Sequence, residues 1–131
     1  MTVRLSSDVY DALFAEAAAA HPLECCGVLL GDRTGVRGIA AARNVHARPA
    51  TRFEIDPQVL IDCHRAERSG GPEVIGYYHS HPGGDARPSA TDEALSTRDG
   101  AVWAIIAGSC LTLWRAGAGG FTSLPYVVRG R

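Results

Sequence analysis

Four short, largely apolar runs, each closed by glycine or by a nearby proline, constrain the fold of this chain more than any other feature. They occupy residues 25–31, 73–80, 101–108 and 110–117. Such runs are shorter than most helices and have the length of buried strands. The first is followed, after a GlyAspArgThrGly turn, by another apolar run at 35–44, and the last two are nearly contiguous. Each of these pairs predicts a hairpin.

Helices are predicted between these strands. They run from near Asp8, after a capping Ser6 or Ser7, to the His-Pro pair at 21–22, from Asp56-Pro57 to the Ser-Gly-Gly-Pro stop at 69–72, and from Ser89 to Ser96. Serine and aspartate are good helix N-caps, and the residue before proline is displaced from the helical region. Two further strands are predicted at 51–55 and 119–128. The order predicts an α/β fold, with one mixed sheet packed by helices.

Composition excludes some function classes. The chain of 131 residues is 46% apolar and 21% charged with a formal net charge of −1, and it has no cluster of basic residues. A nucleic-acid or membrane-surface partner is therefore not expected. The start of the chain lacks the apolar stretch of a signal peptide, so we expect a cytoplasmic protein whose cysteines stay reduced. Those cysteines are Cys25, Cys26, Cys63 and Cys110.

The motif that carries chemistry begins where the 73–80 strand ends. Side chains alternate along a strand, so His79 and His81 point to the same side and can reach one metal ion. Asp92 follows in the first turn of the next predicted helix and is a candidate third ligand. Two imidazoles and one carboxylate leave the fourth position of a zinc ion open, as in catalytic sites. Two structural alternatives stay open: the histidines as edge-strand polar residues, and Ser89 with Asp92 as a helix capping box.

A glutamate stands beside the first buried strand. Glu24 directly precedes the 25–31 run, which is an unexpected place for an acid in a core. It would make sense as a general base that faces a metal-activated water. Cys26 could also lie near the metal, but zinc ligation by cysteine uses spaced pairs, so we assign Cys26 to the core.

Together these segments resemble the JAMM (MPN+) metallopeptidase family. The resemblance lies in Glu24, His79-Ser80-His81-Pro82, Ser89 with seven residues between it and His81, Asp92, and the segments around ProLeuGluCysCysGly, ArgAsnValHis and PheGluIleAspPro. It implies one JAMM/cytidine-deaminase-like domain over residues 1–131, with a mostly antiparallel mixed sheet flanked by helices. It also implies that His79, His81 and Asp92 bind Zn²⁺, that Glu24 activates water, and that Ser89 stabilises the oxyanion.

The resemblance further implies a substrate class. Family members hydrolyse the amide bond after the Gly-Gly tail of ubiquitin-like proteins, so the expected partner is a ubiquitin-like or ThiS/MoaD-like sulfur-carrier protein. The expected enzyme is a prokaryotic stand-alone zinc peptidase or isopeptidase. The alternative is a non-catalytic binding module of the same fold for a ubiquitin-like partner. A zinc deaminase is disfavoured because the chain lacks the His-x-Glu and Pro-Cys-x-x-Cys motifs.

Overall fold

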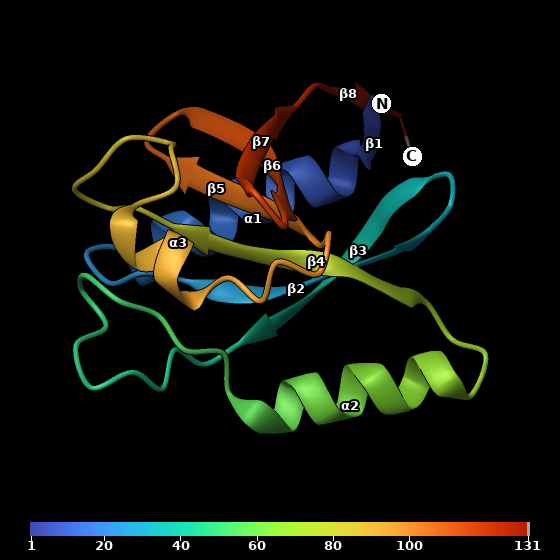
Figure 1. The fold of residues 1–131 in the computed structure, drawn as a ribbon, viewed down its shortest axis with the longest axis horizontal. Coiled ribbons are helices and arrows are strands. Elements are labelled where there is room, and N and C mark those ends of the chain that lie inside the picture. The colour runs from blue at the N-terminus through green and yellow to red at the C-terminus, as the bar shows by residue number, and fades with distance from the viewer. Residues whose placement is uncertain (131) are drawn as a thin grey trace.

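One eight-stranded sheet organises the molecule (Figure 1). The computed structural model describes residues 1–130, and Arg131 lies outside the described part. Its elements are β1 (Val3–Ser6), α1 (Ser7–Ala20), β2 (Cys26–Asp32), β3 (Gly35–Ala42), α2 (Pro57–Arg68), β4 (Glu73–Ser80), α3 (Ala90–Leu95), β5 (Val102–Ala107), β6 (Cys110–Gly117), β7 (Gly120–Leu124) and β8 (Tyr126–Arg129). The strand order is β7-β6-β5-β4-β2-β3-β1-β8. Pairs β1–β3, β1–β8 and β4–β5 are parallel and the other four are antiparallel, which confirms the mixed, mostly antiparallel sheet.

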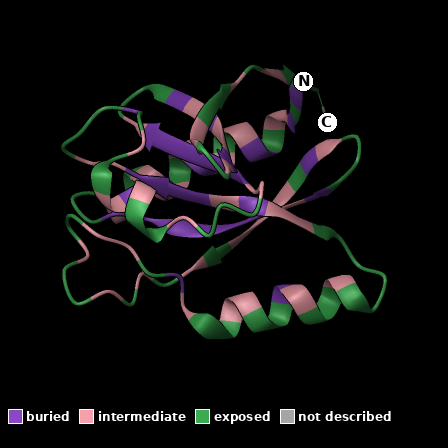
Figure 2. Cartoon of the chain, viewed as in Figure 1, coloured by how far each residue is buried: buried purple, intermediate pink, exposed green. Residues whose placement is uncertain are grey.

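Helices cover both faces of this sheet. α1 packs against β1, β3, β4, β5 and β8, and α2 packs against β2, β3 and β4. Adjacent residues of the central strand β4 show the two faces. The hydroxyl of Tyr78 donates a 3.3 Å hydrogen bond to Glu16 of α1, whereas Tyr77 lines a groove together with Leu60 of α2. The buried residues concentrate in the central strands, and α2 remains largely exposed (Figure 2).

The helix ends follow the predicted capping signals. Ser6 caps α1 by accepting a hydrogen bond from Val9, and His21 ends the helix. Asp56 caps α2 with Pro57 in the first turn. Because these signals are local in the sequence, they are readable before the fold is known.

The central parallel pair requires glycine at one position. A Cβ atom on Gly76 of β4 would lie 1.7 Å from the carbonyl oxygen of Val102 of β5. The two backbones can therefore approach only because that side chain is absent. This contact sets a register in which His79 lies opposite Ile105 at the centre of the sheet.

Two sequence-based predictions of secondary structure were wrong, and one strand was not predicted. Residues 51–55 form no strand and make only an isolated bridge between Asn44 and Ile55, because the loop's polar backbone groups bond to Asn44 and Arg48 instead. The predicted strand at 119–128 is split into β7 and β8 at Pro125, which cannot donate a ladder hydrogen bond. Strand β1 was not predicted, since four residues carry too little periodicity. No helix within residues 1–130 is both long and apolar enough to cross a bilayer.

Candidate active site

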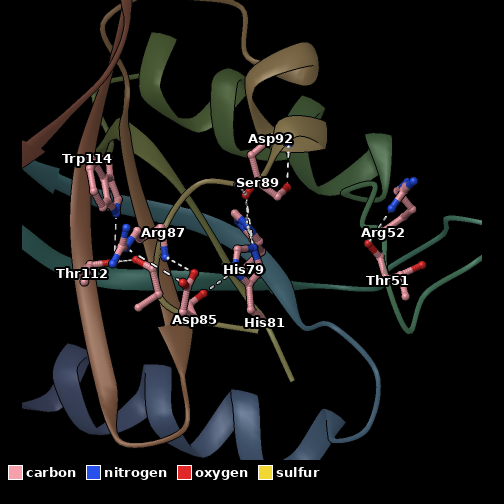
Figure 3. Close-up of polar contacts among 11 residues, drawn as sticks. Thr51, Arg52, His79, His81, Asp85, Arg87, Ser89, Asp92, Thr112 and Trp114 are labelled. Atoms are coloured by element: carbon pink, nitrogen blue, oxygen red, sulfur yellow. Dashed lines mark hydrogen bonds and ion pairs between the residues drawn. The ribbon is translucent and has the colours of Figure 1, made fainter. Parts of the chain in front are cut away.

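Two histidines and one aspartate converge at the end of β4 (Figure 3). The Nε2 atoms of His79 and His81 lie 3.0 Å apart. The Oδ2 atom of Asp92 lies 3.2 Å from Nε2 of His79 and 3.1 Å from Nε2 of His81. The structure therefore brings together the three residues that the sequence predicted as metal ligands.

Strand β4 and helix α3 position these atoms. His79 is the penultimate residue of β4 and is fully buried between β2 and β5. His81 lies just beyond the strand, but its backbone N–H still donates to the carbonyl of Ile106, 2.8 Å away. Both imidazoles thus project from extended backbone, as predicted. Asp92 reaches them from the first turn of α3, which begins at Ala90.

The bond pattern of His81 shows that this cluster fits a cation. Its Nδ1 lies 2.7 Å from the carbonyl oxygen of Asp85, so Nδ1 must carry the proton that is donated. In the neutral ring, Nε2 then presents a lone pair to the Asp92 carboxylate, which already accepts from the Ser89 N–H at 2.9 Å. Lone pairs facing one another repel unless a proton or a metal ion lies between them. Tetrahedral zinc, with bonds of about 2.0–2.1 Å, has ligand–ligand edges of about 3.3 Å, close to the spacing observed.

The pKa directions of His79 and Asp92 favour metal binding, whereas that of His81 favours the protonated ring. Burial lowers the pKa of His79 below its ordinary value, which favours the neutral, metal-binding ring. Burial raises the pKa of Asp92, but hydrogen bonds from His79 and His81 outweigh it and hold the carboxyl ionised. Burial alone would lower the pKa of His81. The Asp92 carboxylate and the Asp85 carbonyl outweigh burial, so the pKa of His81 is raised.

Aromatic packing holds the His79 ring. Phe53 stacks on it with ring centroids 4.3 Å apart and planes 16° from parallel, and Trp103 meets it edge-on at 5.6 Å. Nδ1 of His79 has no hydrogen-bond partner among residues 1–130, so the ring is held by stacking. Neither aromatic residue was singled out from the sequence. The only indication in the sequence was the PheGluIleAspPro segment, which contains Phe53 and resembles the family. That resemblance gives no physical reason for an aromatic ring against His79.

Ser89 takes part in the capping box that the sequence left as an alternative. Its Oγ accepts from the backbone N–H of Asp92 at 3.0 Å, and its own N–H donates to Asp92 Oδ2. The box orients the carboxylate that faces the histidines, so capping and metal binding by Asp92 are compatible. The Ser89 hydroxyl proton is not used by the cap and remains available for donation.

Glu24 lies between α1 and β2, in a segment without regular structure. It is only 7% exposed. Burial raises its pKa to about 7, with the nearby Asp92 adding to this effect and His81 and Arg52 opposing it. A carboxylate with a pKa near neutrality can both accept and return a proton at physiological pH.

An open groove of about 370 Å³ passes beside these groups. Its lining includes Glu24, Arg52, His81, Gly83 and Ser89. A second groove of about 380 Å³ is mostly apolar and is lined by Phe53, Ile55, Pro57, Leu60, Tyr77, Leu95 and Trp103, among others. Because Phe53 and Trp103 also contact His79, the apolar groove adjoins the cluster of His79, His81 and Asp92.

Cys26 is a core residue, as predicted. It is fully buried, and its thiol lies 3.8 Å from the carbonyl of Arg43 and 4.0 Å from that of Glu54. Burial raises the pKa of its thiol to about 12, so it stays protonated. It does not belong to the cluster formed by His79, His81 and Asp92.

Comparison with known proteins agrees with the fold. The family model of prokaryotic homologs of the JAB domain matches residues 6–117. A desampylase of Haloferax volcanii is 38% identical over 108 residues, which cover 77% of this chain and 77% of that protein. A CysO-cysteine peptidase of Mycobacterium tuberculosis is 30% identical over 103 residues, covering 78% of this chain and 70% of the other.

Solved structures show the same fold. A structure described as a JAMM metalloprotease-like zinc site in the proteasome and signalosome aligns with a TM-score of 0.62 at 21% identity, over 97% of this chain and 99% of its own. This likeness confirms the predicted JAMM-type architecture. With the family model covering most of its length, the chain belongs to the prokaryotic JAB-domain family.

Proposed function

We propose that this protein is a zinc peptidase that hydrolyses the amide bond following the Gly-Gly tail of a ubiquitin-like or sulfur-carrier protein. The observation that carries the proposal is the convergence of His79, His81 and Asp92 in one cluster beside the buried Glu24. Two relatives named desampylase and CysO-cysteine peptidase support the assignment of the reaction class. The four cysteines are free, which suits the reducing cytoplasm where we place the activity.

In the proposed mechanism, His79, His81 and Asp92 would hold Zn²⁺ through the three atoms that face one another. When bound, the ion would supply a positive charge that polarises a water molecule and the scissile carbonyl. Glu24 accepts the proton of the attacking water and returns it to the leaving amine, a transfer for which a pKa of about 7 is well matched.

Ser89 stabilises the charge that develops on the carbonyl oxygen. Its Oγ already accepts from the N–H of Asp92, which fixes the side chain, and its hydroxyl proton can be donated toward the groove. One such donor contributes about 3–4 kcal/mol to acyl-transfer reactions elsewhere. The same residue thus caps α3 and serves the reaction.

The two grooves suit the two parts of such a substrate. A Gly-Gly tail has no side chains and can lie extended in the groove between Arg52 and Ser89, which leads to Glu24 and His81. The apolar groove around Leu60 and the half-exposed Leu95 offers a docking surface for the folded part of the carrier. Burial of such apolar surface supplies binding energy away from the reacting bond.

Metal content tests the proposal first. Inductively coupled plasma mass spectrometry should find one zinc per chain in the wild type, none in His81→Ala, and one in the control His64→Ala, whose ring lies on α2 beside Glu67. Circular dichroism should show all three folded. Zinc-loaded wild type should then cleave Gly-Gly-tailed fusions, as followed by mass spectrometry. Absence of zinc after reconstitution at neutral pH would overturn the peptidase assignment and favour a binding module. Bound zinc without cleavage of any such fusion would overturn the substrate class.

A further inference from the structure

We propose that Asn44 is a positioning residue that holds Glu24 in place for proton transfer. It is the only asparagine in the sequence. The inference rests on the proposed role of Glu24 as the general base. Asn44 itself is placed neither among the metal ligands nor in the lining of the groove beside them.

The amide nitrogen of Asn44, which carries two hydrogens, lies within hydrogen-bond distance of three backbone carbonyls. Nδ2 lies 3.0 Å from the oxygen of Glu24, 2.9 Å from that of Arg52 and 3.4 Å from that of Pro49. The amide oxygen accepts from the N–H groups of His46 and Glu54, both at 3.1 Å. This one half-buried side chain therefore links the segment around Glu24 to the beginning and to the end of the loop that follows β3.

Glu24 depends on these contacts because it lies outside any helix or strand. Its N–H donates to the carbonyl of Pro49 at 2.8 Å, and its own carbonyl accepts from Asn44. Asn44 also bonds to the Pro49 carbonyl, so both ends of the Glu24 residue are held through the same loop. Without the amide, two of these carbonyls lose their side-chain donor and the loop is released from Glu24.

The same side chain braces the other flank of the site. Asn44 bonds to the residues immediately before and after Phe53, whose ring stacks on the ligand His79. Only a neutral amide offers paired donors and an acceptor in this compact fork, and a carboxylate of equal size offers no donors. A misplacement of about 1 Å in a reacting group can cost roughly a hundredfold in rate.

The test compares Asn44→Asp and Asn44→Ala with the wild type. Asn44→Asp keeps the size and the bonds accepted from His46 and Glu54 but cannot donate, so it serves as the test variant if Asn44→Ala does not fold. The matched control is Glu67→Ala, which removes another side-chain tether to the backbone, the 2.9 Å bond from the Val74 N–H at the far end of β4. Zinc content, kcat and KM are measured for each, together with NMR hydrogen exchange at the Glu24 amide.

For a folded Asn44 variant with full zinc, we expect kcat to fall at least about tenfold and KM to stay within about threefold. The Glu24 amide should exchange at least about tenfold faster, because its acceptor loop is loosened. Glu67→Ala should lose stability yet keep kcat. The proposal is overturned if kcat of a folded, zinc-loaded Asn44 variant stays within about threefold of wild type, or if exchange at Glu24 is unchanged. If the wild type cleaves no fusion, the proposed function is wrong instead. The inference about Asn44 is then decided by the hydrogen exchange of the Glu24 amide alone.

Discussion

Replacing Glu24 by glutamine should make the protein both inactive and more stable at high pH. Glutamine keeps the shape of the side chain but removes the charge that the buried position disfavours. The loss of the proton carrier should reduce kcat by about 10²–10⁴-fold. The gain in stability has a definite pH dependence, which follows from the raised pKa.

The magnitude follows from the pKa of Glu24, which is about 7 in the folded protein against an ordinary value of 4.5. Because the folded-state value is the higher one, the folded protein holds this proton more tightly than the unfolded chain does. Below pH 4.5 both states are protonated and burial of the charge costs nothing. Above pH 7 the folded protein carries a buried charge, at a cost of about 3 kcal/mol by the relation of 1.36 kcal/mol per pKa unit. The open groove supplies solvent screening, so we expect about 1–3 kcal/mol.

Urea denaturation of the metal-free proteins tests this reasoning. The difference in unfolding free energy between Glu24→Gln and the wild type should grow by about 1–3 kcal/mol between pH 5 and pH 8. His81 and Asp92, the charged neighbours of Glu24 in the cluster, also titrate. Because both proteins contain them, their effect on the difference in unfolding free energy largely cancels. An equal difference at the two pH values would refute the raised pKa. Full cleavage activity in zinc-loaded Glu24→Gln would remove Glu24 from the mechanism.

Four further substitutions probe other parts of the site. Asp92→Asn should weaken zinc binding at least about tenfold because a charged ligand is lost, and unchanged affinity in a metal titration would leave Asp92 with only its capping role. Ser89→Ala should cost about 0.5–2 kcal/mol in thermal unfolding and should also lower kcat at full zinc content; a loss of stability alone would contradict its catalytic role. Leu60→Asp should raise KM for a carrier fusion several-fold with little change in kcat, whereas an unaltered KM would argue against docking in the apolar groove. Gly76→Ala should destabilise the fold by more than about 3 kcal/mol, because its Cβ would overlap the Val102 carbonyl, and a near-wild-type melting temperature would show that β4 and β5 separate easily.

Much of the fold and the grouping of His79, His81 and Asp92 were predictable because the signals are local. The strand at 73–80 is observed with the predicted bounds, and Asp56 caps α2 at the predicted place. The alternation of side chains along a strand was enough to place His79 and His81 on one side of the chain. The return of Asp92 to them was predicted from a short connection and a helix start, which are also local features.

Other parts of the site depend on residues that meet only after folding. Residues 51–55 alternate like a strand, yet their backbone groups bond to Asn44, and the sequence pattern does not show that competition. The stacking of Phe53 and the edge-on contact of Trp103 on His79 join a loop, β4 and β5, which are separated in the chain.

The sequence by itself therefore determined most of the elements and the identity of the groups that can bind a metal, since periodicity and caps act over a few residues. Only the tertiary structure decided the chemical properties of the groups in the site. Burial in the folded protein raises the pKa of Glu24 to about 7. The backbone carbonyl of Glu24 accepts a hydrogen bond from Asn44, which is twenty residues away in the chain. Desolvation and long-range hydrogen bonds depend on what surrounds a side chain in space, and that environment exists only once the sheet and its loops are assembled.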